Sequence, residues 1–136
     1  MNSRDSKLLR NLVPALTQTG VPRPRVPVSP MNEWEQKYAQ HLRMRQVAGE
    51  VRTFEFEAMR LRMGIAANEP GSRGSWFTPD FSVWLTDGSF ELHEVKGFWR
   101  EAARVRIKTA ASLYPFRFVV VRKVRGGCFE VMETFN

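Results

Sequence analysis

The sequence has one cysteine, Cys128, and two histidines among 136 residues. A single cysteine cannot form a disulfide within the chain, and so few cysteines and histidines exclude the common zinc clusters. No apolar run is long enough to span a bilayer, and the first residues lack the apolar core of a signal peptide. We therefore expect a soluble cytoplasmic protein with no membrane partner.

Acidic residues are scarce relative to basic ones: 14 Asp and Glu against 21 Lys and Arg, a formal net charge of +7. A basic protein attracts polyanions, above all nucleic acid, although charge alone leaves DNA, RNA and anionic membranes open. Residues 1–30 hold five cations and one acid, hence +4, and the remainder holds 16 cations and 13 acids, hence +3. The positive excess is therefore concentrated at the start of the chain.

Five of the eight prolines also fall within residues 1–30. Proline lacks a backbone donor and favours extended geometry, so this segment is predicted to be a flexible basic arm outside the folded domain. Two interpretations of the arm stay open: an unstructured tail and an arm that grips DNA. The folded domain is predicted at residues 31–136.

From residue 31 onward, apolar residues recur with helix and strand periodicity. Helical spacing predicts a first helix that begins near Asn32 and stops near Gly49. The strand–helix–strand pattern over residues 90–121 predicts two parallel strands. The fold class is predicted to be α/β, with a mixed sheet of four or five strands flanked by helices. The remaining elements are predicted as one long or two short strands over residues 54–63, a loop over 64–75, a hairpin over 76–96, a helix over 99–113, and strands over 116–121 and 128–132.

The residues that suggest chemistry lie in the hairpin. Asp80 is followed, after thirteen intervening residues, by Glu94-Val95-Lys96. Residues i and i+2 of a strand share a face, so Glu94 and Lys96 point the same way. Carboxylates bind Mg²⁺, which activates water and polarises phosphoryl oxygens, and a nearby ammonium stabilises charge on the phosphate. The group suits phosphodiester hydrolysis, although Asp80 could merely organise a turn and Glu94 and Lys96 could be neighbouring surface charges.

The expected register of the hairpin raises a difficulty. Asp87-Gly88 is a strong signal for a two-residue turn, which pairs Phe81 with Glu94. That pairing places Asp80 on the opposite face of the sheet from Glu94, where one metal could not contact both. We therefore predict a β-bulge or bend near Asp80-Phe81 that restores a common face.

The motif also resembles a known superfamily. Pro79-Asp80 followed by Glu94-Val95-Lys96 resembles the motif of the PD-(D/E)XK nucleases, and the order of predicted elements resembles their core. More narrowly, the chain is similar to a family of small phage and prophage proteins, itself similar to the phage endonuclease I type of Holliday-junction resolvase. The resemblance covers about residues 31–132. The resemblance includes Met31-Asn32, Glu35, Tyr38-Ala39 and the aromatic strand at residues 54–61. Its most specific strings are Trp-Phe-Thr-Pro-Asp-Phe at residues 76–81 and Glu-Val-Lys-Gly-Phe-Trp at residues 94–99.

The resemblance implies a restriction-endonuclease-like fold and hydrolysis of DNA that depends on Mg²⁺, for which Mn²⁺ would substitute. It implies that Asp80 and Glu94 are metal ligands, that Lys96 is the catalytic lysine, and that the carbonyl of Val95 contacts the metal. Members also carry a glutamate on the first helix. Glu35 fits this position because it shares one line of that helix with residues predicted to face inward.

Two further groups have competing interpretations. Glu35 lies three residues after Asn32, where it would also form a capping box. Basic residues spaced four apart form a stripe on the second predicted helix, either an ordinary solvated face or a phosphate-binding one. His93 alternates to the face opposite Glu94 and is expected to be a core or surface histidine. The residues of the stripe are Arg100, Arg104 and Lys108.

The sequence thus predicts a metal-dependent DNA endonuclease, most specifically one that selects branched DNA. Cutting both strands of a symmetric junction would require a homodimer. A phage-encoded protein would act in the cytoplasm of its bacterial host. Two alternatives stay open: a phage nuclease for packaging, recombination or DNA breakdown, and a non-catalytic DNA-binding module that gains nothing from clustering Asp80, Glu94 and Lys96.

Overall fold

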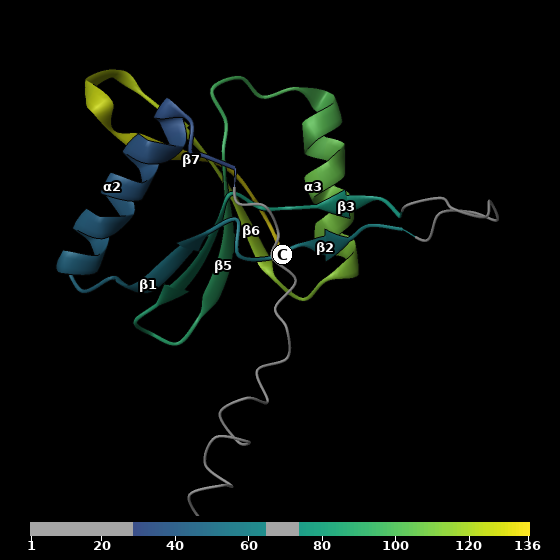
Figure 1. The fold of residues 1–136 in the computed structure, drawn as a ribbon, viewed down its shortest axis with the longest axis horizontal. Helices are drawn as coiled ribbons and strands as arrows, with labels where there is room; N and C mark the ends of the chain where they lie inside the picture. Colours follow the sequence, from purple (N-terminus) through teal and green to yellow (C-terminus); the bar gives the residue numbers. More distant parts are fainter. Residues whose placement is uncertain (1–28, 65–73) are drawn as a thin grey trace, which may run out of the picture.

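The computed structural model describes residues 29–64 and 74–136 (Figure 1). Residues 1–28 of the predicted arm and residues 65–73 of the predicted loop lie outside the described residues. None of the helices found in the described ranges combines the length and apolar character that a bilayer crossing requires.

The described elements follow the predicted order of helix, strands, hairpin, helix and strands. Residues 54–63 contribute to two strands, one of the two predicted options. In chain order the elements are α2 (Glu33–Val47), β1 (Val51–Phe56), β2 (Leu61–Arg62), β3 (Trp76–Phe77), β4 (Phe81–Leu85), β5 (Phe90–Val95), α3 (Glu101–Leu113), β6 (Arg117–Lys123), the 3-10 turn η1 (Arg125–Gly127) and β7 (Phe129–Phe135).

The main sheet has the strand order β1-β4-β5-β6-β7. The β5–β6 pair is parallel, and α3 connects its two strands; the other neighbours are antiparallel. A parallel pair requires such a crossover, which confirms the predicted strand–helix–strand unit. The predicted α/β class with a mixed sheet and flanking helices is also confirmed. β2 and β3 form a separate two-stranded ribbon.

Each face of the sheet packs against one helix (Figure 1). Side chains alternate between the two faces along β4, β5 and β6, so one strand supplies both cores. Burying each large apolar side chain contributes about 1.5–3 kcal/mol. The core on the α2 face contains Tyr38, Ala39, Leu42, Val51, Phe81, Val83, Val95, Val119 and Val121. The core on the α3 face contains Leu61, Phe77, Leu92, Ile107, Ala110, Phe118 and Val120.

The α2 face also buries a hydrogen-bonded polar cluster. His93 is 1% exposed, which confirms a core position for this histidine. Its Nδ1 lies 2.7 Å from the Tyr38 hydroxyl and its Nε2 lies 2.8 Å from the Glu91 carboxylate. Burial lowers the pKa of His93, so the ring is neutral and has one donor nitrogen. A carboxylate can only accept, so Nε2–H donates to Glu91 and Tyr38 donates to Nδ1.

The turn between β4 and β5 has three residues, and the predicted two-residue turn is wrong. The Leu85 N–H donates to the Ser89 carbonyl at 2.9 Å, which leaves residues 86–88 as the loop. Gly88 closes it with a φ of 90°, as in hairpins that combine a type I turn with a left-handed residue. Asp87 does not occupy a mirror-image turn; its carboxylate accepts from the Ser89 N–H at 2.8 Å.

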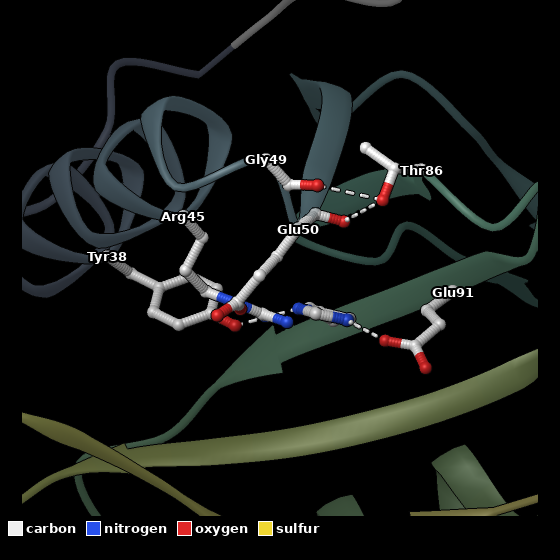
Figure 2. Close-up of polar contacts among 7 residues, drawn as sticks. Tyr38, Arg45, Gly49, Glu50, Thr86 and Glu91 are labelled. Carbon is white, nitrogen blue, oxygen red and sulfur yellow. Dashed lines mark hydrogen bonds and ion pairs between the residues drawn. The ribbon is translucent and has the colours of Figure 1, made fainter.

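Contacts with the α2–β1 connection hold this loop in place. The Thr86 hydroxyl donates to the Gly49 carbonyl at 2.8 Å, and the Thr86 N–H donates to the Glu50 carbonyl at 3.1 Å. Figure 2 shows Thr86 bonded to both carbonyls. Thr86, the first residue of the loop, is therefore fixed by partners that are remote in the sequence.

The longer loop shifts the pairing of the hairpin by one residue. Phe81 pairs with His93 instead of Glu94, and the pairing runs without interruption to Trp84. Of the two predicted irregularities near Asp80-Phe81, the bend is present at Asp80, whereas the β4–β5 ladder contains no bulge. Continuing the observed register places Asp80 opposite Glu94, on the α3 face.

We expect Gly88→Ala to destabilise the protein by about 1 kcal/mol, because a side chain strains a backbone with a φ of 90°. The matched control is Gly97→Ala, since Gly97 has no positive φ and an added Cβ there meets no described atom within 4 Å. Urea unfolding measures both free energies. Equal effects of the two substitutions would contradict the assigned loop.

Candidate functional site

Asp80 lies just before β4, held by hydrogen bonds to two neighbouring strands. Its carbonyl accepts from the Glu57 N–H at 2.8 Å, and Glu57 has a φ of 44°, unusual for a residue with a side chain. Its Oδ2 accepts from the Val95 N–H at 2.8 Å. Its own N–H donates to Oε2 of Glu94 at 3.3 Å. These bonds fix the Asp80 carboxylate against the end of β5.

Glu94 and Lys96 point to the same face as Asp80. Lys96 Nζ lies 2.7 Å from Oε1 of Glu94, so the glutamate is held between an ammonium and the Asp80 amide. Glu94 is 8% exposed, whereas the Lys96 side chain is 27% exposed and reaches solvent. The structure therefore brings together the three residues that the sequence singles out for chemistry.

Burial makes ionisation of both acids unfavourable. It raises the pKa of Asp80 to about 8, with a further rise from the negative charge of Glu94, against which the Val95 N–H and Lys96 act. Burial also raises the pKa of Glu94, and Lys96 opposes this effect. When ionised, the two carboxylates carry more negative charge than one ammonium neutralises. Hard oxygen donors with excess negative charge fit a divalent cation such as Mg²⁺.

Glu35 occupies the third position of α2, where it forms a capping box. Its Oε2 accepts from the Asn32 N–H at 2.8 Å, and its N–H donates to the Asn32 side chain at 3.0 Å. Its charge nonetheless contributes to the raised pKa values of Asp80 and Glu94. The capping interpretation is confirmed. The role of Glu35 as a metal ligand stays a prediction.

Within the described ranges, no three His, Cys, Asp or Glu side chains lie close enough together to hold a metal ion. Asp80 and Glu94 therefore form a pair of carboxylates with no third acid beside them in these ranges. Val95 contributes its N–H to Asp80, and its side chain packs in the core of the α2 face. Contact between the Val95 carbonyl and a metal stays a prediction.

A groove of about 330 Å³ lies between Glu94 and α3. Glu94 and Lys96 form part of one wall, and two arginines of or next to α3 line it as well. A cationic groove beside paired carboxylates can hold a phosphodiester close to them. The complete lining is Phe77, Glu94, Lys96, Arg100, Ala102, Ala103, Arg106 and Ile107.

The three residues of the predicted basic stripe have different surroundings in the structure. Arg100 lines the groove. Arg104 makes a two-point contact with Glu133 of β7, with N–O distances of 2.8 and 2.9 Å, and Lys108 is exposed. DNA contact by Arg104 and Lys108 stays a prediction.

Sequence reasoning missed Arg106, the second arginine of the groove. It lies three residues after Ala103 and next to Ile107, both of which face the sheet side of α3. The signal that would have identified Arg106 is its position: a basic residue beside the apolar residues of a helix that face the sheet, near a candidate site. The even four-residue spacing of the predicted stripe drew attention to Arg104 and Lys108 instead.

We expect Asp80→Asn to stabilise the metal-free protein at high pH, since asparagine still accepts the Val95 N–H but carries no charge. Folding raises the pKa of Asp80 to about 8, so the folded protein holds this proton more tightly than the unfolded chain. Wild-type stability therefore falls as the pH rises through this window. Urea unfolding in EDTA should show the variant roughly 1–3 kcal/mol more stable at about pH 9, and equal to the wild type near pH 4.

The control is Asp87→Asn, which tests a carboxylate with the opposite shift. The Ser89 hydroxyl lowers the pKa of Asp87, so its ionised form stabilises the fold. This variant should lose stability at high pH instead of gaining it. A gap between Asp80→Asn and the wild type that does not change with pH would contradict the assigned environment of Asp80.

The comparisons with known proteins yield one family. No curated protein and no solved structure gives a significant match. The model of a family described as "Protein of unknown function (DUF1064)" matches residues 32–125. This span contains the carboxylate pair, Lys96 and both arginines of the groove. Because the match covers more than half of the chain, the chain belongs to the DUF1064 family.

Proposed function

We propose that this protein is a metal-dependent DNA endonuclease of the PD-(D/E)XK type. The observation that carries the proposal is the convergence of Asp80 and Glu94 beside Lys96, with Glu94 and Lys96 in the wall of a cationic groove. The mixed sheet with a helix on each face supports the restriction-endonuclease-like fold that the sequence motif implies. Within this proposal the preferred substrate is branched DNA, cut by a homodimer.

Asp80 and Glu94 would hold Mg²⁺ or Mn²⁺, with Glu35 and the Val95 carbonyl as further candidate ligands. The fit rests on the donor set: two largely buried carboxylates whose charges raise each other's cost of ionisation. A bound ion of this kind polarises a phosphoryl oxygen and lowers the pKa of a coordinated water. The Val95 N–H holds one Asp80 oxygen in place, so the carboxylate is oriented before any ligand arrives.

Lys96 supplies a positive charge at the site. Glu94 holds its ammonium at 2.7 Å, and the side chain is partly exposed on the groove side. From this position the ammonium can donate to a non-bridging phosphate oxygen or to the attacking water, where it stabilises charge that develops during hydrolysis. Arg100 and Arg106 would position the phosphate along the groove.

A purely DNA-binding module explains the site less well. Two acids buried beside a groove for phosphates would repel the ligand and raise the cost of folding, without any benefit to binding. A nuclease requires such a pair, because an acidic pair recruits the cation that catalysis needs. The burial of Glu94 together with Asp80 therefore favours the enzyme.

Substitutions at the two kinds of residue should separate catalysis from metal binding. Lys96→Ala and Asp80→Asn should each reduce Mg²⁺-dependent cleavage by about 10²-fold or more, because each removes transition-state stabilisation. Mg²⁺ should raise the thermal midpoint of the wild type and of Lys96→Ala, whose carboxylates remain, but not that of Asp80→Asn. Gel-based cleavage and thermal unfolding with and without Mg²⁺ measure the two effects.

Lys37→Ala is the matched control. Lys37 pairs with Glu33 on the surface of α2 and is not among the residues that line the groove. It should cleave as the wild type does. Unchanged cleavage by both site variants would sink the nuclease proposal. If Mg²⁺ still raised the thermal midpoint of Asp80→Asn, Asp80 would not be a metal ligand.

Branched DNA should be the best substrate among a four-way junction, a nicked duplex, a linear duplex and a single strand of matched sequence. A junction presents two phosphodiesters related by symmetry, which a homodimer with one site per subunit can reach together. Single-turnover rates on the four substrates make the comparison. Equal rates on all four would remove the resolvase-like specificity and favour a nuclease for packaging or DNA breakdown.

A further inference from the structure

The ribbon formed by β2 and β3 is fastened to α3 (Figure 1). Leu61 and Phe77, which pair across it, are buried in the core of the α3 face. The Tyr114 hydroxyl donates to the Arg62 carbonyl at 2.8 Å, and Arg106 donates to the Trp76 carbonyl. Both strands are thus tied to the end or side of the helix, so side chains on the outer face project from a fixed base.

The outer face of the ribbon carries arginines arranged around a tryptophan. Arg62 pairs with Trp76 across the strands, and Arg60, just before β2, lies over the same ring. The guanidinium carbons of Arg60 and Arg62 lie 4.7 and 6.0 Å from the centre of the Trp76 ring. Cation–π contact limits the conformations of these long side chains and orients their planar groups.

These cations are not neutralised by acids within the described ranges. Neither Arg60 nor Arg62 forms an ion pair there, and the same holds for Arg106. By contrast, Arg104 and Arg122 are each paired with a glutamate of β7. The ribbon therefore presents concentrated positive charge, already oriented, to whatever approaches it.

The ribbon is continuous with the candidate active site. β3 ends at Phe77, and Asp80 follows three residues later. Phe77 and Arg106 line the same groove as Glu94 and Lys96, and Arg106 also bonds to the ribbon at Trp76. A polyanion that lies along the groove would meet the ribbon next.

We propose that the β2–β3 ribbon is a second DNA-contacting element, which binds backbone phosphates of the duplex beside the scissile phosphate through Arg60 and Arg62. This inference rests on the proposed nuclease function. Phosphates fit better than bases, because the guanidinium groups lie over the Trp76 ring that a stacking base would need. The guanidinium fork matches phosphate oxygens at two points. Trp76 is the positioning residue that orients the fork.

The test is DNA binding in EDTA, where cleavage does not occur and catalysis cannot affect the result. Labelled linear duplex and four-way junction are titrated by fluorescence anisotropy over a range of salt concentrations. The double variant Arg60→Ala with Arg62→Ala should bind roughly 30-fold more weakly at about 0.15 M salt, with a salt-dependence slope reduced by about two. Two phosphate contacts are lost, each with its released counterion.

The charge-matched control is Arg43→Ala with Arg52→Ala, two exposed arginines of α2 and β1 that form no ion pair within the described residues. It should retain most of the affinity. Arg62→Lys keeps the charge but not the planar fork, so we expect weaker binding with an unchanged salt slope. This single variant separates an oriented contact from charge alone.

A double variant that binds like the control would overturn the ribbon proposal while leaving the nuclease proposal intact, provided that the wild type cleaves DNA. An Arg62→Lys variant that binds like the wild type would overturn the role of Trp76 in orienting the guanidinium. A wild-type protein that binds neither DNA in EDTA would overturn the ribbon proposal and count against the nuclease proposal as well.

Discussion

The register between β4 and β5 is the constraint on which the candidate site depends. It is set by a three-residue loop, closed by the Leu85–Ser89 hydrogen bond and anchored through Thr86 to the preceding connection. A loop shorter by one residue would exchange the two faces of a strand. Asp80 would then lie across the sheet from Glu94, and Phe81 would leave the core of the α2 face. Core packing and site assembly therefore demand the same register.

The site itself works against the stability of the fold. Asp80 and Glu94 are desolvated, and each ionised carboxylate makes the other less favourable. The two apolar cores outweigh this cost, because the strands that carry the acids are sandwiched between α2 and α3. Stored electrostatic strain of this kind is typical of functional sites, and a cation would relieve it. The other two buried polar residues of β5, Glu91 and His93, bond to each other, and His93 also bonds to Tyr38.

Local patterns predicted the element order, the α/β class and the juxtaposition of Glu94 with Lys96, since each depends on neighbours in sequence. The turn was mispredicted because Asp87-Gly88 suits two loop lengths, and the choice is made by the bond from Thr86 to Gly49, a residue 37 positions away. The sequence suggested DNA contact for Arg104 without knowledge of Glu133, its ion-pair partner 29 positions away, and that contact stays a prediction. The arginines of the ribbon were missed because their grouping requires the pairing of β2 with β3. The turn length and the ribbon were thus missed because contacts between residues distant in the sequence determine them.

The separation between the ribbon and the β4–β5 turn has a consequence for variation in this architecture. The segment from Gly64 to Gly74 joins the two strands of the ribbon, whereas the placement of Asp80 is fixed from the other end, by the loop at residues 86–88. Lengthening or shortening that segment leaves the parity of Asp80 untouched, and only its own pairing must adjust. The length of the segment between β2 and β3 can therefore vary without moving Asp80 away from Glu94. A single insertion in the β4–β5 loop would instead place the two acids on opposite faces of the sheet.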